Sequence, residues 1–140
     1  MPGLTLVHRT DAPVDTGSVR ASLATTQSTD ASPDLSHDLL YTSRHTVLAV
    51  SYYSKYPWRS IETERFQIVL EGHIYDLESP ADESLTEVAD QIFRRSSSQS
   101  YLSSWLPTVD GEFVLWIRSR ESGRMVLLND VLGRLPLYSH

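Results

Sequence analysis

The stretch DGEFVLWIRSRESGRMVLLNDVLGRLPLY, residues 110–138, decides the fold of this chain. Two runs of apolar and β-branched residues, Glu112–Arg118 and Met125–Asn129, flank a turn at Ser122-Gly123. This spacing predicts an antiparallel hairpin, because two short apolar strands joined by a Gly-containing turn pair with each other. One more strand is expected over Leu137–Ser139.

Three strands are predicted upstream of this hairpin. Leu4–His8 is a short apolar run, and Thr46–Ser54 and Phe66–Leu70 are rich in β-branched and aromatic residues. Tyr56-Pro57-Trp58 is expected to turn the chain between the second and third of them.

The segment Thr10–Asp38 is rich in Thr, Ser, Asp, Ala and Pro and holds no aromatic residue. This composition predicts a long loop over residues 10–38, with at most one weak helix near Ser18–Thr25.

Two helices are predicted between the strands. Ser79 and Pro80 supply an N-cap and a first helical residue, and apolar residues at helical spacing follow: Leu85, Val88, Ala89, Ile92 and Phe93. A second helix is expected over Gln99–Leu106, ending at Pro107. The order of elements predicts an α+β fold in which helices pack on antiparallel sheets.

The composition bounds the classes of function. The 140 residues fit a single domain over 1–140, and the net charge of −6 with scattered Arg argues against a nucleic-acid surface. The absence of Cys excludes thiol catalysis, disulfides and thiolate metal sites. Neither a membrane span nor a secretory signal is seen, so the cytoplasm is the expected location.

A second landmark, Val69–Asp76, reads VLEGHIYD, and a third, Leu85–Val88, reads LTEV. With the hairpin and its closing segment, this ordered set resembles the glutamine amidotransferase domain of asparagine synthetases, of the class II or N-terminal-nucleophile type, over about residues 45–139. The resemblance implies a four-layer α/β/β/α sandwich of the N-terminal-nucleophile hydrolase type with mostly antiparallel sheets. It also implies a part in asparagine biosynthesis.

The positions that carry chemistry in that family are altered in this chain. Pro2 stands near the place of the N-terminal Cys, and Glu71 stands where the family has the oxyanion Asn, just before Gly72 and His73. A carboxylate at that place would repel a developing oxyanion. Leu85 replaces the Asp that reads the substrate ammonium, and His45–Val50 offers no Arg for the substrate carboxylate. The resemblance therefore implies a degenerate pocket without catalytic residues.

The expected function is that of a catalytically inactive amidotransferase-like domain that docks on, stabilises or regulates an ATP-dependent amide ligase of the asparagine synthetase type. The ligase would be a domain of the same polypeptide or a separate subunit. A homodimer is an open alternative, and no cofactor, metal, nucleic acid or membrane partner is expected. Two other functions stay open: a residual hydrolase rebuilt around Pro2, Glu71 and His73, and a small-molecule module that binds an amino acid.

Overall fold

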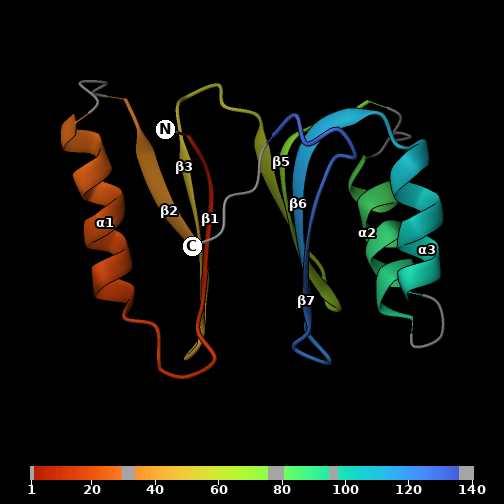
Figure 1. Ribbon diagram of the computed structural model, residues 1–140, viewed down its shortest axis with the longest axis horizontal. Helices are drawn as coiled ribbons and strands as arrows, with labels where there is room; N and C mark the ends of the chain where they lie inside the picture. The colour runs from red at the N-terminus through yellow and green to blue at the C-terminus, as the bar shows by residue number, and fades with distance from the viewer. Residues whose placement is uncertain (1, 30–33, 76–80, 95–97, 136–140) are drawn as a thin grey trace. The chain divides into compact units, whose positions relative to one another are not determined.

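The computed structural model describes residues 2–29, 34–75, 81–94 and 98–135. The chain divides into two compact units, unit 1 over Met1–Tyr56 and unit 2 over Pro57–His140. Each unit contains a sheet and at least one helix (Figure 1), and every strand pair in the described ranges is antiparallel. The predicted α+β class is confirmed, whereas the single amidotransferase-like domain over 1–140 stays a prediction.

Unit 1 is a three-stranded sheet accompanied by one helix. The strands are β1 (Gly3–His8), β2 (Ser36–Thr42) and β3 (Thr46–Tyr52), in the order β1-β3-β2, and α1 (Thr16–Thr29) lies between β1 and β2 in the sequence. The central strand β3 is buried from Thr46 to Ser51, as its β-branched and aliphatic composition predicts. The predicted strands at Leu4–His8 and Thr46–Ser54 are therefore confirmed.

The prediction of a long loop over residues 10–38 is wrong for much of that segment. Helix α1 occupies Thr16–Thr29, so the weak helix near Ser18–Thr25 exists and is longer than predicted. Asp15 starts it, because its carboxylate accepts hydrogen bonds from the Gly17 amide at 2.9 Å and the Ser18 hydroxyl at 2.6 Å. The Ser- and Thr-rich sequence hides the helix because only Val19 and Leu23 give it an apolar stripe.

Strands β2 and β4 (Trp58–Glu62) were missed from the sequence. The alternation of β2 is broken by a register shift between Leu39 and Tyr41, so its apolar residues do not follow a period of two. Strand β4 begins at Trp58, where the sequence predicted a turn, and buries only Ile61. A short edge strand of this kind lacks the apolar run by which strands are recognised.

Unit 2 is a four-stranded sheet in the order β4-β5-β6-β7. Strand β5 (Phe66–Ile74) pairs with β6 (Gly111–Ser119), and β6 forms the predicted hairpin with β7 (Met125–Asn129). The helices α2 (Ala81–Phe93) and α3 (Ser98–Trp105), followed by the 3₁₀ turn η1 (Leu106–Thr108), connect β5 to β6. Both predicted helices are confirmed; the proposed cap residues Ser79 and Pro80 and the strand at Leu137–Ser139 lie outside the described residues.

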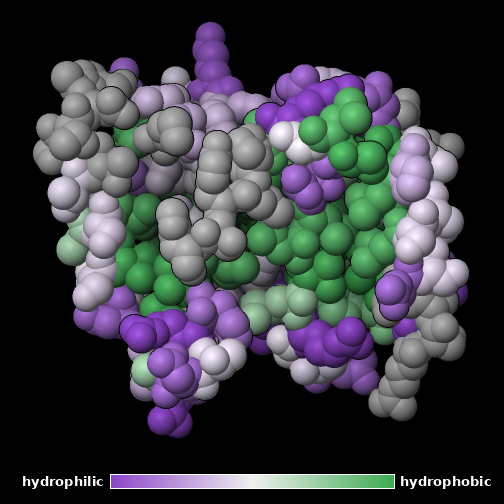
Figure 2. Space-filling view, viewed as in Figure 1, coloured by the Kyte–Doolittle hydropathy of each residue, from purple (hydrophilic) through white to green (hydrophobic). Residues whose placement is uncertain are grey.

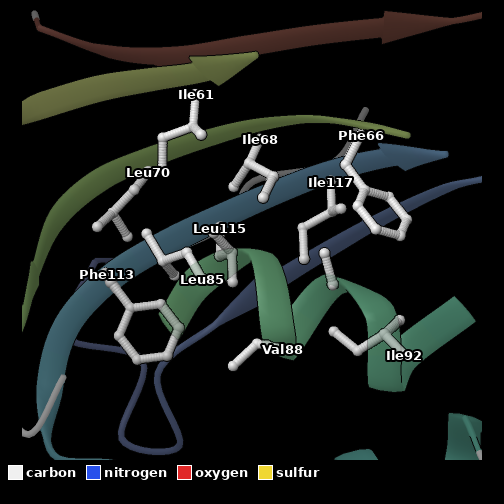
Figure 3. Close-up of a cluster of buried hydrophobic side chains, with 11 residues drawn as sticks. Ile61, Phe66, Ile68, Leu70, Leu85, Val88, Ile92, Phe113, Leu115 and Ile117 are labelled. Carbon is white, nitrogen blue, oxygen red and sulfur yellow. The ribbon is translucent and has the colours of Figure 1, made fainter. Parts of the chain in front are cut away.

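The core of unit 2 forms between α2 and one face of its sheet (Figure 3). Helix α2 presents four buried side chains at a spacing of three and four residues, which places them along one stripe. They pack against alternate residues of β5 and β6, because successive strand side chains point to opposite faces. The cluster comprises Ile61, Phe66, Ile68, Leu70, Leu85, Val88, Ala89, Ile92, Phe113, Leu115 and Ile117.

Helix α3 covers the edge of this core. The Tyr101 and Trp105 rings stack with their centroids 6.1 Å apart, and Trp105 tilts against Phe113 at 6.4 Å. No helix within the described ranges is long and apolar enough to cross a lipid bilayer.

Candidate functional site

Three segments that are distant in the sequence meet at one end of the unit 2 sheet. Ile74, at the end of β5, pairs with Gly111 at the start of β6, and the Tyr75 amide donates to the Asp110 carbonyl at 2.9 Å. The Asp130 amide, just after β7, donates to the Phe113 carbonyl at 3.1 Å. These segments belong to two of the three sequence landmarks, Val69–Asp76 and residues 110–138, so we take this end of the sheet as the candidate site.

Gly72 forms a bend in β5 that requires glycine. Its φ of +85° lies in a region that side chains disfavour, and a Cβ there would lie 1.9 Å from the Glu112 carbonyl oxygen and 2.9 Å from Leu135 Cδ1. The Gly72 amide donates a hydrogen bond of 2.7 Å to the Pro57 carbonyl. The amide is therefore already engaged within unit 2.

Glu71 is a buried carboxylate on the other face of the sheet from the helices. Its side chain is 6% exposed, and the residue pairs with Trp58 and Val114. Leu70, its neighbour, belongs to the core under α2, so the alternation of strand side chains turns Glu71 away from the helices.

The five pocket positions predicted from the sequence are not all brought together. Leu85 is fully buried in the core on the helix side of the sheet, and Glu71 lies on the opposite face. His73 is exposed, and its ring stacks with Tyr75 at a centroid distance of 6.4 Å. Pro2 belongs to unit 1, where it precedes β1 and is half-buried. Within unit 2, Glu71, Gly72 and His73 are adjacent at the strand end.

Asp130 organises the turn that closes the site. Its side chain is 4% exposed, and its carboxylate accepts hydrogen bonds from the backbone amides of Leu132, Arg134 and Leu135 at 3.0 to 3.4 Å. Burial by itself raises the pKa of Asp130, but these amides outweigh it and hold the pKa below its ordinary value. The carboxylate is therefore charged, and it supplies the hydrogen-bond acceptor that water would otherwise supply to these three amides.

Arg134 and Gly133 complete this turn. The Arg134 guanidinium donates to the Gly111 carbonyl at 3.1 Å and lies 3.4 Å from the Asp110 carboxylate. Gly133 has a φ of +61°, which allows the chain to reverse. In the sequence, Asp130 and Gly133 were only part of the closing segment that contributes to the resemblance. An Asp followed three residues later by Gly is a turn pattern that could have indicated this role.

No protein-family model matches the chain, and neither does any curated protein. The site must therefore be interpreted from its own geometry. In the described part of the chain, no group of three His, Asp or Glu side chains is arranged to hold a metal ion.

The other histidines of the described residues contact polar atoms of unit 1 that are distant in the sequence. His8 Nδ1 lies 2.9 Å from Thr46 Oγ1, His37 Nδ1 lies 2.7 Å from Ser51 Oγ, and His45 Nδ1 lies 3.3 Å from the Ala12 carbonyl oxygen. Two of these three contacts join neighbouring strands of the unit 1 sheet.

Proposed function

We propose that this chain is a catalytically inactive domain of the class II glutamine amidotransferase type, which docks on an ATP-dependent amide ligase of the asparagine synthetase type and stabilises or regulates it. The ordered landmarks from Gly72 to Gly133 support this proposal. Two of the three landmarks, Val69–Asp76 and residues 110–138, meet at one end of the unit 2 sheet, although their parts are up to about 60 residues apart in the sequence. The third, Leu85–Val88, lies on α2, with Leu85 in the core.

The engaged Gly72 amide is the observation that carries the inactive part of the proposal. The resemblance requires a thiol nucleophile and a pair of donors for the oxyanion, one of them from Gly72. The chain has no Cys, its Gly72 amide donates to the Pro57 carbonyl, and a carboxylate occupies the position of the second donor. Loss of one oxyanion donor typically costs about 10² to 10³ in rate, so loss of both together with the nucleophile leaves no route to glutamine hydrolysis.

The proposed architecture is the four-layer α/β/β/α sandwich. Its support is the apolar character of both faces of each sheet, which is typical of a sheet covered on both sides. In unit 1, α1 lies over the face of Thr5 and Val7, and the pairing of β1 with β3 puts apolar side chains on the opposite face too: Leu4, Leu6, Leu48 and Val50. In unit 2, the face away from α2 carries Val69, Val114, Trp116 and Leu127.

Two measurements test the function. Purified protein incubated with glutamine should release no ammonia above a protein-free blank, while a known glutaminase serves as the positive control. Any release that Pro2→Ala or Glu71→Ala abolishes would establish the residual hydrolase instead.

The second measurement concerns the partner. The chain should form a saturable complex with the asparagine synthetase-type ligase encoded in the same genome, and the complex should change the melting temperature or the amide-forming rate of that ligase. If the purified ligase neither binds the chain nor changes in its presence, the docking function is refuted.

A further inference from the structure

Strand β7 forms an open edge of the unit 2 sheet. It pairs with β6 on one side, and no described strand pairs with it on the other. Its residues, Met125–Asn129, are all half-buried, and none of them is charged. In Figure 2, hydrophobic side chains gather over the part of unit 2 where Figure 1 shows β7. An uncharged, apolar edge of this kind is open to pairing with a further strand.

The opposite edge of the same sheet is protected. Strand β4 carries Arg59 and Glu62, and both are held in ion pairs, Arg59 with Asp82 at 3.5 Å and Glu62 with Arg120. Charged side chains on an edge strand discourage another strand from pairing with it. The sheet therefore protects its β4 edge and leaves its β7 edge unprotected.

The hydrogen bonds at the two ends of β7 show which of its backbone groups face outward. The Ser119 amide donates to the Arg124 carbonyl at 2.9 Å, and the Asp130 amide donates to the Phe113 carbonyl at 3.1 Å. Because alternate residues of an antiparallel strand bond to the same neighbour, the even-numbered residues of 124–130 bond to β6. The amides and carbonyls that point away from β6 belong to the odd-numbered residues: Met125, Leu127 and Asn129. No hydrogen bond to these outward groups is found within the described ranges.

A second copy of the chain fits this edge when the two β7 strands run antiparallel about Leu127. In that register Leu127 lies opposite Leu127 of the second copy, and Met125 lies opposite Asn129 of the second copy. The outward groups of one strand then meet those of the other. Val126, which packs against the unit 2 core as Leu128 does, lies opposite Leu128 of the second copy, so the pairing extends the apolar core across the junction.

The two ends of β7 carry charges of opposite sign. Arg124, just before the strand, is exposed and forms no ion pair within the described ranges. The other end holds the carboxylates of Asp110, Glu112 and Asp130 beside the guanidinium of Arg134. The antiparallel register brings Arg124 of each copy to the acidic end of the other, so the contact is attractive at both ends.

We infer that β7 is a dimerisation edge, through which two copies of this chain pair antiparallel about Leu127 and join their unit 2 sheets into one. Pairing of two short edge strands buries a small area, so the dimer is expected to be weak and dependent on concentration. The inference does not rest on the proposed function, because it depends only on the edge of the unit 2 sheet.

Sedimentation equilibrium of the full chain tests the dimer. The wild type should pass from monomer to dimer as its concentration rises towards about 1 mM. Leu127→Pro removes an outward amide and leaves the hydrogen bonds to β6 in place, as proline is tolerated on an edge strand whose N–H faces outward. Two-fold symmetry makes the junction lose two hydrogen bonds and gain two proline rings, so the dissociation constant should rise by about tenfold or more.

Ser60→Pro on the β4 edge is the matched control. The Pro57 carbonyl accepts from Gly72, and the Thr63 amide donates to the Phe66 carbonyl at 2.9 Å, so the odd-numbered residues of 57–63 bond to β5. The amide of the exposed Ser60 therefore points outward, as that of Leu127 does. Ser60→Pro should dimerise as the wild type does.

Hydrogen–deuterium exchange of the wild type gives a readout that needs no variant. Raising the protein concentration should slow exchange of the outward amides of Met125, Leu127 and Asn129, because they become hydrogen-bonded in the dimer. The outward amide of Ser60 should exchange at the same rate at every concentration.

Three results would overturn the inference. The first is a wild type that stays monomeric up to about 1 mM with fast-exchanging β7 amides. The second is a dimer that Leu127→Pro leaves intact, and the third is a dimer that Ser60→Pro weakens equally, since in both cases the contact lies elsewhere. Circular dichroism and melting temperature establish that each variant is folded, and if Leu127→Pro does not fold, the exchange experiment on the wild type decides.

Discussion

Adding one methyl group at Gly72 tests whether the bend of β5 is built as described. The variant Gly72→Ala would hold a side chain at a φ of +85° and place its Cβ 1.9 Å from the Glu112 carbonyl oxygen. Gly123→Ala is the matched control, because its φ of +69° carries the same kind of backbone penalty and its Cβ meets nothing within 4 Å.

The magnitude follows from the two contributions. An L-residue in left-handed conformation costs about 1 to 2 kcal/mol, and this is the whole effect expected for Gly123→Ala. At Gly72 the clash with a backbone carbonyl cannot be relieved by a side-chain rotation, so β6 must shift, which adds about 1 to 3 kcal/mol. Gly72→Ala should therefore lower the free energy of unfolding by roughly 2 to 5 kcal/mol, which is more than Gly123→Ala.

Urea titration followed by tryptophan fluorescence measures both variants, since Trp116 is fully buried and reports on the unit 2 sheet. The midpoint for Gly72→Ala should lie well below that for Gly123→Ala at an unchanged slope. Equal midpoints would show that Gly72 does not approach the Glu112 carbonyl as closely as 1.9 Å from a Cβ implies, and would refute the described bend in β5.

Three further predictions concern stability. Asp130→Asn should lower the free energy of unfolding by about 2 kcal/mol at neutral pH. Because the pKa of Asp130 is lowered in the folded state, the wild type should keep its full advantage above pH ~5 and lose it as the pH falls through that pKa. A difference between the urea midpoints of the two proteins that stays constant from pH 7 to 2 would contradict this prediction. Leu85→Ala should lower the free energy of unfolding by about 2 to 5 kcal/mol by calorimetry. Leu85→Asp, which introduces the residue of the amidotransferase family that the chain resembles, should unfold unit 2, and a folded Leu85→Asp variant would disprove the core assignment. Asp90→Ala removes the partner of the exposed Arg65 and Arg94 and should cost about 1 kcal/mol at low salt and less in 1 M NaCl; a cost independent of salt would exclude an ion-pair origin.

Elements with strong local signals were predicted well. Helix α2 has a regular apolar stripe, and the β6–β7 hairpin has two apolar runs around a Gly turn. Each of these patterns is compatible with few other secondary structures. Helix α1 and strand β2 were obscured because α1 is rich in Ser and Thr and β2 contains a register shift. Their existence depends on a cap at Asp15 and on pairing with β3, which local composition does not express.

The candidate site was predicted in part. The sequence placed Glu71, Gly72 and His73 at a strand end, and they are adjacent on β5. It also grouped Leu85 with them, but Leu85 lies in the core on the other face from Glu71. A list of altered positions states which residues differ and not which way their side chains point, because direction depends on the register of β5 and the rotation of α2.

By itself, the sequence determined that thiol chemistry is absent, that the net charge disfavours phosphate partners, and where the strongly periodic elements lie. Only the tertiary structure decided that Pro57 engages the Gly72 amide, that Asp130 braces a turn from below, and that Val131 and Leu132 are left in water. The reason is physical, because composition and periodicity are local properties of the sequence. A hydrogen bond between strands and the burial or exposure of a side chain depend on which distant segments the sheet brings together.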